Sequence, residues 1–299
     1  MSRVLFLLSF LLFTFIGFAQ SNDHYNIEIE TWQAKRLSDL KAPTGWINLA
    51  GLFWLEEGRN TFGSDSSNKL VFNHPYFPSL AGTFKRTGYS VEWISADEVV
   101  ATDSKGVPIL KKEIFNPDSS NNPTLVLGQF RFTIIKREDK IGVRFRDTRS
   151  PALNYYNEIP RFAPDLQWKI TASFEPSYGK KIPITNVLGQ TTLQPSPGKL
   201  VFTWQGKQYK LDAIDEGGNE LFIIFGDATS GVDTYPAGRF MYVNKPTAAG
   251  VVIVDFNKAF NPPCAFSDFA TCPLPPKQNI LPFAVNAGEK TVHPYKASH

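Results

Sequence analysis

The sequence predicts a mainly β fold, arranged as a single antiparallel β-sandwich or barrel-like domain, and three observations support this. Short apolar or alternating runs recur from residue 69 to residue 256, separated by Gly, Pro, Asn and Asp. One stretch alone, residues 25–40, has the spacing of an amphipathic helix. The 299 residues include 25 Phe, which is enough material for one sizeable core. We therefore expect one domain over residues 20–299, ending in a long Pro-rich C-terminal loop.

The first 19 residues have the pattern of a cleavable signal peptide. Arg3 gives a basic start, residues 4–18 are apolar, and Gly17 and Ala19 are the small residues that signal peptidase requires. The apolar run is shorter than the roughly 20 residues that span a bilayer. We expect cleavage after Ala19 and a periplasmic or secreted protein without a membrane span.

Residues 25–40 are expected to form a helix that packs on the body of the domain. Its apolar positions follow the three-to-four spacing of one helical face, and they are Ile29, Trp32, Leu37 and Leu40. Pro43 is expected to end it. The next stretch, residues 44–64, is dense in Trp, Leu and Gly, which favours short strands joined by tight turns.

The β body is expected to consist of many short strands. The pair at 130–137 and 141–147 is separated by three polar residues and is the clearest hairpin. The other expected strands are residues 69–72, 82–86, 89–95, 168–174, 199–204, 208–214, 220–227, 238–243 and 250–256. Strands at this spacing, with few helical patterns between them, indicate an antiparallel sandwich or barrel.

Residues 254–290 are expected to form an ordered loop and not a flexible tail. Proline blocks helix and sheet ladders there, while eight large apolar residues provide surface to bury, namely Phe256, Phe260, Phe266, Phe269, Leu274, Ile280, Leu281 and Phe283. Both cysteines, Cys264 and Cys272, lie in this loop. In an exported chain they are expected to form a disulfide. A thiolate nucleophile or a metal ligand is the alternative, but zinc would need two more ligands.

Four segments of the chain together resemble a bacterial family of exported proteins of unknown function, DUF1684. They are GWINLAGLFWLEEGRNTFGS, GVRFRDTRSP, GDATSGVDTYPAGRF, and the C-terminal series DFNKAFNPPCAF, CPLPP and AGEK. They occur in the family's order over nearly the whole chain after the signal peptide. The resemblance implies an envelope-associated protein and marks these segments as places to look for a site.

Charge and composition exclude several classes of partner and cofactor. The net charge is +3, from 31 basic and 28 acidic residues, too small to indicate nucleic acid binding. The four His give little material for a metal centre or a Ser-His-Asp triad, and His74 is expected to cap a local turn. No glycine-rich phosphate loop is present. We expect neither a metal nor another cofactor.

If the protein is an enzyme, carboxylates must transfer the protons. The candidates are Asp147, Asp227, Asp255 and Glu289, with Tyr235 beside them, because the three aspartates stand at the ends of expected strands. The alternative is that each carboxylate caps a turn or pairs with a nearby arginine. The oxygen-rich segment 225–240 lacks the spacing of an EF-hand calcium loop.

Two functional hypotheses follow. In the first, the protein binds a small molecule or an envelope component, and the polar contacts come from Arg146, Arg239, Asn257 and Asn261 in loops beside the sheet. In the second, it is a metal-independent hydrolase or lyase that uses a pair of the carboxylates named above. Trp46, Trp54 and Trp93 could form a sugar-stacking platform, but burial in the core explains them more simply.

Overall fold

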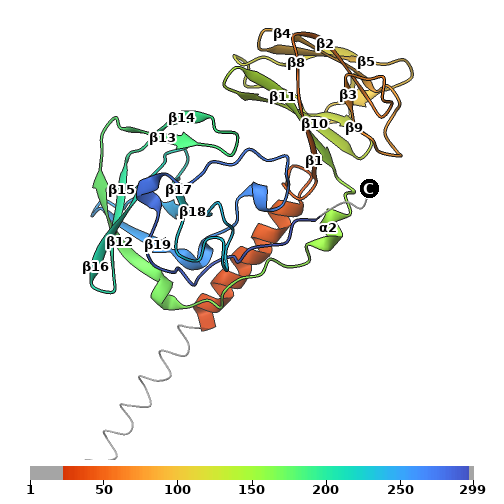
Figure 1. Cartoon of the computed structure of the whole chain (residues 1–299). Helices are drawn as coiled ribbons and strands as arrows, with labels where there is room; N and C mark the ends of the chain where they lie inside the picture. The colour runs from red at the N-terminus through yellow and green to blue at the C-terminus, as the bar shows by residue number, and fades with distance from the viewer. Residues whose placement is uncertain (1–22, 296–299) are drawn as a thin grey trace, which may run out of the picture. The chain divides into compact units, whose positions relative to one another are not determined.

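The computed structural model describes residues 23–295, and this part of the chain packs as two compact units (Figure 1). Unit 2 comprises residues 40–157 and 267–270, and unit 1 comprises the remaining described residues. Each unit has its own hydrophobic core. The sequence suggested one continuous core. In the structure, the strands within residues 69–204 are divided between the two units. The strands of both units have similar sequence patterns, so the sequence does not show where one unit ends and the other begins.

The described chain is mainly β, and nearly all of its strands pair antiparallel, which confirms the predicted fold class. Among residues 23–295, no helix is long and apolar enough to cross a membrane. The expected signal peptide, residues 1–19, lies outside the described residues.

The predicted N-terminal helix forms over residues 23–41. Its apolar face is buried through Tyr25 and Ile29, while Trp32 and Leu37 are partly buried. The helix ends at residue 41, two residues before Pro43, as predicted. A proline ring disfavours the helical conformation of the residue that precedes it.

Unit 2 contains two sheets around a phenylalanine-rich core. The six-stranded sheet has the order β1 (Leu49–Trp54), β11 (Lys140–Asp147), β10 (Phe130–Arg137), β9 (Leu125–Leu127), β6 (Ala101–Thr102) and β7 (Pro108–Ile109). The second has the order β3 (Leu70–Val71), β2 (Gly58–Gly63), β4 (Gly82–Thr87), β5 (Ser90–Ser95) and β8 (Lys111–Phe115). Trp93 is fully buried among the phenylalanines, as expected for a core residue. A helical turn, α2 (Ala152–Tyr155), follows β11 in the chain.

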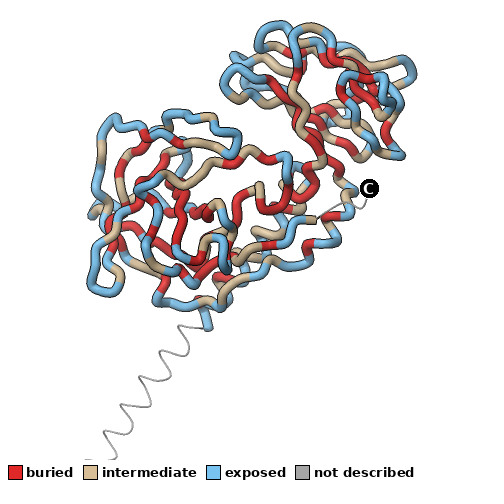
Figure 2. The backbone as a smooth tube through the Cα atoms, viewed as in Figure 1, coloured by how far each residue is buried: buried red, intermediate tan, exposed pale blue. Residues whose placement is uncertain are grey.

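Unit 1 is built on a four-stranded sheet with two hairpins. The sheet has the order β16 (Lys207–Ala213), β15 (Gly198–Trp204), β12 (Lys169–Pro176) and β19 (Val251–Asp255). The hairpins pair β13 (Lys181–Thr185) with β14 (Thr191–Pro195), and β17 (Glu220–Phe225) with β18 (Arg239–Asn244). Figure 2 shows the buried stretches of backbone gathered inside each unit.

The C-terminal segment 254–290 is ordered, although it has almost no sheet structure. It contains three short 3₁₀ turns, η2 (Phe256–Lys258), η3 (Pro263–Ala265) and η4 (Lys277–Asn279). Phe256 and Leu281 are buried in the core of unit 1, whereas Phe269 and Ile280 are exposed, unlike the expectation that all eight apolar side chains are buried. The predicted disulfide joins Cys264 to Cys272.

Candidate functional site

Asp227 and Arg239 form a fully buried ion pair in unit 1. Nη2 of Arg239 lies 2.8 Å from Oδ2 of Asp227, and neither side chain is reached by solvent. The backbone N–H and the hydroxyl of Thr229 donate to the other carboxylate oxygen. Arg239 also donates to the carbonyls of Val285 and Ala287. Burial lowers the pKa of Arg239, an effect that Asp227 opposes. This pair therefore holds the C-terminal segment against β18.

Asp255 and Asn257 form a second buried network, with the N-terminal helix. The hydroxyl of Tyr25 donates to Asp255 over 2.8 Å, and the side-chain amide of Asn257 donates to the Tyr25 oxygen and to the carbonyl of Asp165. Burial, followed by the hydrogen bond to Asp255, raises the pKa of Tyr25. These contacts connect residues about 230 positions apart and are structural.

Glu289 and Asn261 form a third network. One Glu289 oxygen lies 3.3 Å from Nε of Arg36, and the other accepts the backbone N–H of Asn261 over 2.7 Å. The Asn261 side chain donates to the carbonyl of Lys290. Burial raises the pKa of Glu289, and Arg36 opposes that rise. Like the other two networks, this one joins separate backbone segments.

The remaining predicted catalytic residues lie in turns. Asp147 ends β11 in unit 2, where it accepts the Arg149 backbone N–H and the Gln129 side chain, with His74 3.6 Å away. The predicted turn-capping role of His74 is confirmed, because its Nδ1 accepts the backbone N–H of Tyr76. Tyr235 is partly buried in the turn before β18, and its carbonyl accepts the N–H of Gly238. Each of the four predicted carboxylates has at least one hydrogen-bond partner, and Oδ2 of Asp255 is buried without one.

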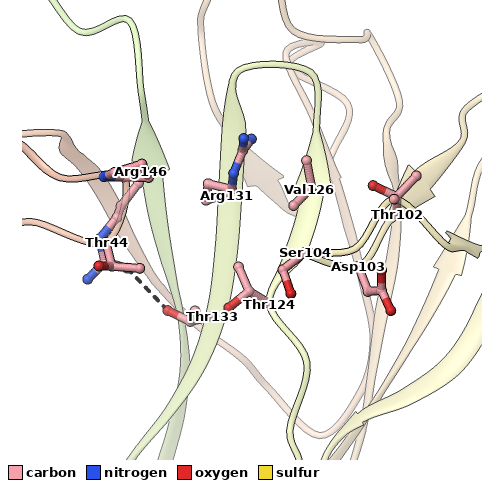
Figure 3. A pocket seen from close by; sticks show the side chains of 11 residues that line it. Thr44, Thr102, Asp103, Ser104, Thr124, Val126, Arg131, Thr133 and Arg146 are labelled. Atoms are coloured by element: carbon pink, nitrogen blue, oxygen red, sulfur yellow. Dashed lines mark hydrogen bonds between the residues drawn. The ribbon is translucent and has the colours of Figure 1, made fainter.

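A cavity of about 370 Å³ lies on the six-stranded sheet of unit 2, on the face opposite the phenylalanine core. Figure 3 shows the side chains that line it. We call it the arginine pocket. Its lining combines guanidinium groups and hydroxyls with apolar surface, and the lining residues are Pro43, Thr44, Thr102, Asp103, Ser104, Gly106, Thr124, Val126, Arg131, Thr133 and Arg146. One predicted ligand-binding residue, Arg146, is therefore in a cavity, while Arg239, Asn257 and Asn261 belong to the buried networks described above.

Strand alternation places the arginines on this face. Val143 and Phe145 of β11 point into the core, so Arg144 and Arg146 point to the opposite side. In the register of β10 with β11, Arg131 lies directly opposite Arg146, and Thr133 opposite Arg144. Like charges placed opposite each other across a sheet destabilise it.

Three arginines lie on this face of the sheet without a carboxylate partner, and two of them, Arg131 and Arg146, line the pocket. Arg146 donates to the carbonyl of Gly45 over 3.0 Å and to the hydroxyl of Thr133 over 3.3 Å. Arg131 turns back toward the β9–β10 turn and donates to the carbonyl of Gly128 over 2.7 Å. Within residues 23–295, none of Arg131, Arg144 and Arg146 forms an ion pair with a carboxylate. Among the described residues that line the pocket, Asp103 is the one with an acidic side chain.

Arg144 is the least satisfied of the three. It is 9% exposed, and its Nε and Nη2 atoms are buried without a hydrogen-bond partner. The ring of Trp46 lies 4.7 Å from its guanidinium carbon and 5.9 Å from that of Arg146. Burial, and then the neighbouring Arg146, lower the pKa of Arg144 to about 10, which still leaves it charged at neutral pH.

Sequence reasoning missed most of this pocket. Arg146 was predicted as a ligand-binding residue, but Arg131, Thr133 and Arg144 were not. The signal was available, because the predicted hairpin of 130–137 with 141–147 puts these four side chains on one face. Trp46 contacts the arginines and belongs to no stacking platform, and Trp54 lies under the Lys140 ammonium.

No group of three or more His, Cys, Asp or Glu side chains that could hold a metal ion occurs in the part of the chain that the structure describes.

Comparison with known proteins gives a family for the C-terminal half of the chain. Residues 154–290 match the model of the family described as "Protein of unknown function (DUF1684)", which confirms the resemblance for that part. No curated protein matches. A solved structure with similarity is the solution NMR structure of an uncharacterized protein of Haloarcula marismortui, 28% identical, with a TM-score of 0.40. The match covers 48% of this chain and 81% of that one.

Proposed function

We propose that this chain, whose residues 154–290 belong to the DUF1684 family of proteins of unknown function, binds a small anionic molecule in the arginine pocket of unit 2. The observation that carries the proposal is the set of three arginines on this face without a carboxylate partner. Arg131 and Arg146 line the pocket, and Arg144, next to Arg146, is a buried guanidinium with two unbonded nitrogen atoms. A buried charge without a counter-charge is strongly destabilising. A carboxylate, phosphate or sulfate group would supply that counter-charge.

The neighbouring groups suit an anion. Arg146 lies two residues along the same face of β11, and a guanidinium donates in a fork that matches two oxygens of one carboxylate or phosphate. The hydroxyls of Thr124, Thr133 and Ser104 line the same cavity and can donate to a third oxygen. A cavity of about 370 Å³ is at the small end of the range for ligand sites, which favours a small metabolite-sized anion.

The test is binding of defined anions by the full chain. Phosphate, sulfate, succinate and citrate would be titrated by calorimetry in a low-anion buffer, and thermal unfolding would be followed with and without each. An anion present at about ten times its Kd should stabilise the folded protein by about 1.4 kcal/mol. Arg146→Gln should abolish that effect, while Arg59→Gln, an exposed arginine of β2, should preserve it. If no anion stabilises the protein, or if Arg146→Gln responds like the parent, the proposal fails.

A carboxylate-pair hydrolase, the second function suggested by the sequence, receives no support from the contacts. Asp227, Asp255 and Glu289 each have buried partners, and Asp147 caps a turn. A general base must reach substrate, and these groups are used to join backbone segments.

Export remains part of the proposal. Two features support it, the apolar run of residues 4–18 after Arg3 and a disulfide in a chain with only two cysteines. Mass spectrometry of the protein expressed with its N-terminus intact would test it. A mature chain that begins at Gln20 is expected, and retention of residues 1–19 would contradict export through this signal.

A further inference from the structure

A second cavity lies in unit 1, and the proposed anion site does not involve it. It is an open groove of about 680 Å³, bounded by the 3₁₀ turn η1 (Leu166–Trp168), the β15–β16 turn and residues 283–286. All of its lining residues fall within the DUF1684 match, residues 154–290. We call it the aromatic groove.

Three aromatic rings in the groove share nearly one orientation. The rings of Trp168 and Trp204 stack at 4.3 Å between centroids with 23° between their planes, and Phe283 lies 6.0 Å from Trp204 at 24°. Trp168 is buried, whereas Trp204 and Phe283 are partly exposed. Tyr209 packs edge-on against Phe283 at 4.7 Å. The core thus continues to the surface as an aromatic shelf.

Strand periodicity explains why a tryptophan stands there. Leu200 and Phe202 of β15 point into the core, and Trp204 is the next residue on that face, at the end of the strand. The sheet ends at Trp204, so one part of the indole packs on the core and the other part reaches the groove.

The polar groups around the shelf are mainly amides. Gln167, Gln205 and Asn286 line the groove and are exposed, and each amide both donates and accepts hydrogen bonds. Asp165 is the one ionisable side chain in the lining as described, and it already accepts from the backbone and side chain of Gln167. The Lys290 ammonium lies 4.6 Å from the ring centroid of Phe162, another lining residue. Its positive charge offsets the negative charge of Asp165, so the groove has little net charge.

Gln205 holds an unusual backbone conformation at the tip of this rim. Its φ is +48°, in the left-handed region, and it precedes Gly206 in the β15–β16 hairpin. Asn, Asp and Gly are the residues that such two-residue hairpin turns prefer, and glutamine is not among them. The longer side chain gives the turn no benefit, but it places an amide on the groove.

We propose that the aromatic groove binds an uncharged oligosaccharide, with a sugar ring on the Trp204–Phe283 shelf and its hydroxyls bonded to the three amides. A pyranose has an apolar C–H face that packs on aromatic rings, and an equatorial rim of hydroxyls that needs donors and acceptors together. Charge favours a neutral sugar, since the groove lining contains no Lys, Arg or His, and the one neighbouring ammonium described, that of Lys290, is offset by the carboxylate of Asp165. This site is independent of the anion pocket proposed above.

The experiment is a titration of the full chain, followed by tryptophan fluorescence and calorimetry. The probes are cellotetraose, chitotetraose and maltotetraose as neutral chains, tetragalacturonate as an acidic chain, and tetramethylammonium as a cation that aromatic sites with a carboxylate also bind. At least one neutral chain is expected to bind and to change the fluorescence. Trp204→Ala removes the aromatic ring and should weaken binding of that neutral chain about tenfold or more.

Variants separate binding from folding. Trp204→Ala could unfold the protein because the ring packs on Trp168, so Gln205→Gly is the decisive change. Glycine adopts positive φ readily, so the turn should be kept while the affinity falls roughly three- to tenfold with the loss of one amide. Tyr178→Ala removes an aromatic side chain that is 94% exposed elsewhere in unit 1, and it should bind like the parent.

Three results would overturn the proposal. One is that none of the three neutral tetrasaccharides binds at 10 mM, a concentration about tenfold above a weak Kd of 1 mM. Another is that the affinity is unchanged in both Gln205→Gly and Phe283→Ala. The third is that tetragalacturonate or tetramethylammonium binds more tightly than every neutral chain.

Discussion

Replacing Arg144 with methionine should make the protein more stable and, by removing a positive charge next to Arg146, weaken anion binding at the same time. Methionine keeps most of the length and apolar stem of arginine but not its charge. The guanidinium contributes no hydrogen bond through Nε or Nη2, and Arg146 repels it. Only the contact with Trp46 is lost.

The size of the effect follows from the charge. Burial lowers the pKa of Arg144 from the usual arginine value to about 10, and since one pKa unit corresponds to about 1.4 kcal/mol, the folded state holds this charge at a cost of roughly 3 kcal/mol. Loss of the cation–π contact with Trp46 takes away about 1 kcal/mol. The net gain is about 2 kcal/mol, which should raise the urea midpoint by about 1 M.

The assay is urea unfolding followed by circular dichroism in a low-anion buffer, together with calorimetric titration of the anion that the parent binds. Arg86→Met is the matched control, because Arg86 in the same unit donates to the carbonyls of Leu55 and Gly88 and should be destabilised by losing them. If Arg144→Met is as destabilised as Arg86→Met, or still binds the anion with parental affinity, the reasoning about an unmatched charge is refuted.

Three further predictions concern unit 1. Arg239→Met should lose about 3–5 kcal/mol of unfolding free energy, since Asp227 remains buried without a partner, whereas Lys245→Met, which breaks a surface pair, should lose less than about 1 kcal/mol; urea unfolding of both compares them. Burial raises the pKa of Glu289, so its contribution to stability is complete below the unfolded value near about 4.3 and is lost as pH rises through the folded value. The urea midpoint of the parent should therefore fall more steeply than that of Glu289→Gln as the pH is raised from 4. An equal dependence of the two midpoints on pH would contradict this. Reduction of the disulfide should lower stability by about 2–3 kcal/mol, and an unchanged thermal midpoint in reductant would count against it.

Local pattern predicted the elements of this fold well, and long-range pairing lay beyond it. The alternation in FRFTIIKR and GVRFRD correctly predicted β10 and β11, and the helix ended before Pro43 as expected. The partner of β11 on its other side is β1, about 90 residues earlier in the chain, and no local signal specifies that pairing. The division into two units follows from such pairings, so the sequence did not reveal it.

The site shows the same limit in a different form. Arg146 was predicted as a ligand-binding residue and lines a cavity, because a charged side chain on a strand that is otherwise apolar is visible in the sequence. Arg239, Asn257 and Asn261 were predicted on the same grounds, but they bind backbone and carboxylate groups of neighbouring segments. An irregular, proline-rich segment has many backbone groups that are not paired in helices or sheets, and polar side chains must bond to them. The sequence alone cannot distinguish such side chains from those that bind a ligand.

The path of the chain through unit 1 has a consequence for biosynthesis. The helix at residues 23–41 bonds through Tyr25 to Asp255 and through Arg36 to Glu289, and residues 40–157 of unit 2 come between. A ribosome that adds 5–20 residues per second needs roughly 10–50 seconds to make the intervening 230 or so residues. For that time the helix has an exposed apolar face and no partner. Unit 2 can form nearly all of its own contacts as soon as residues 40–157 have left the ribosome. The helix is therefore synthesised before unit 2 but packs after it.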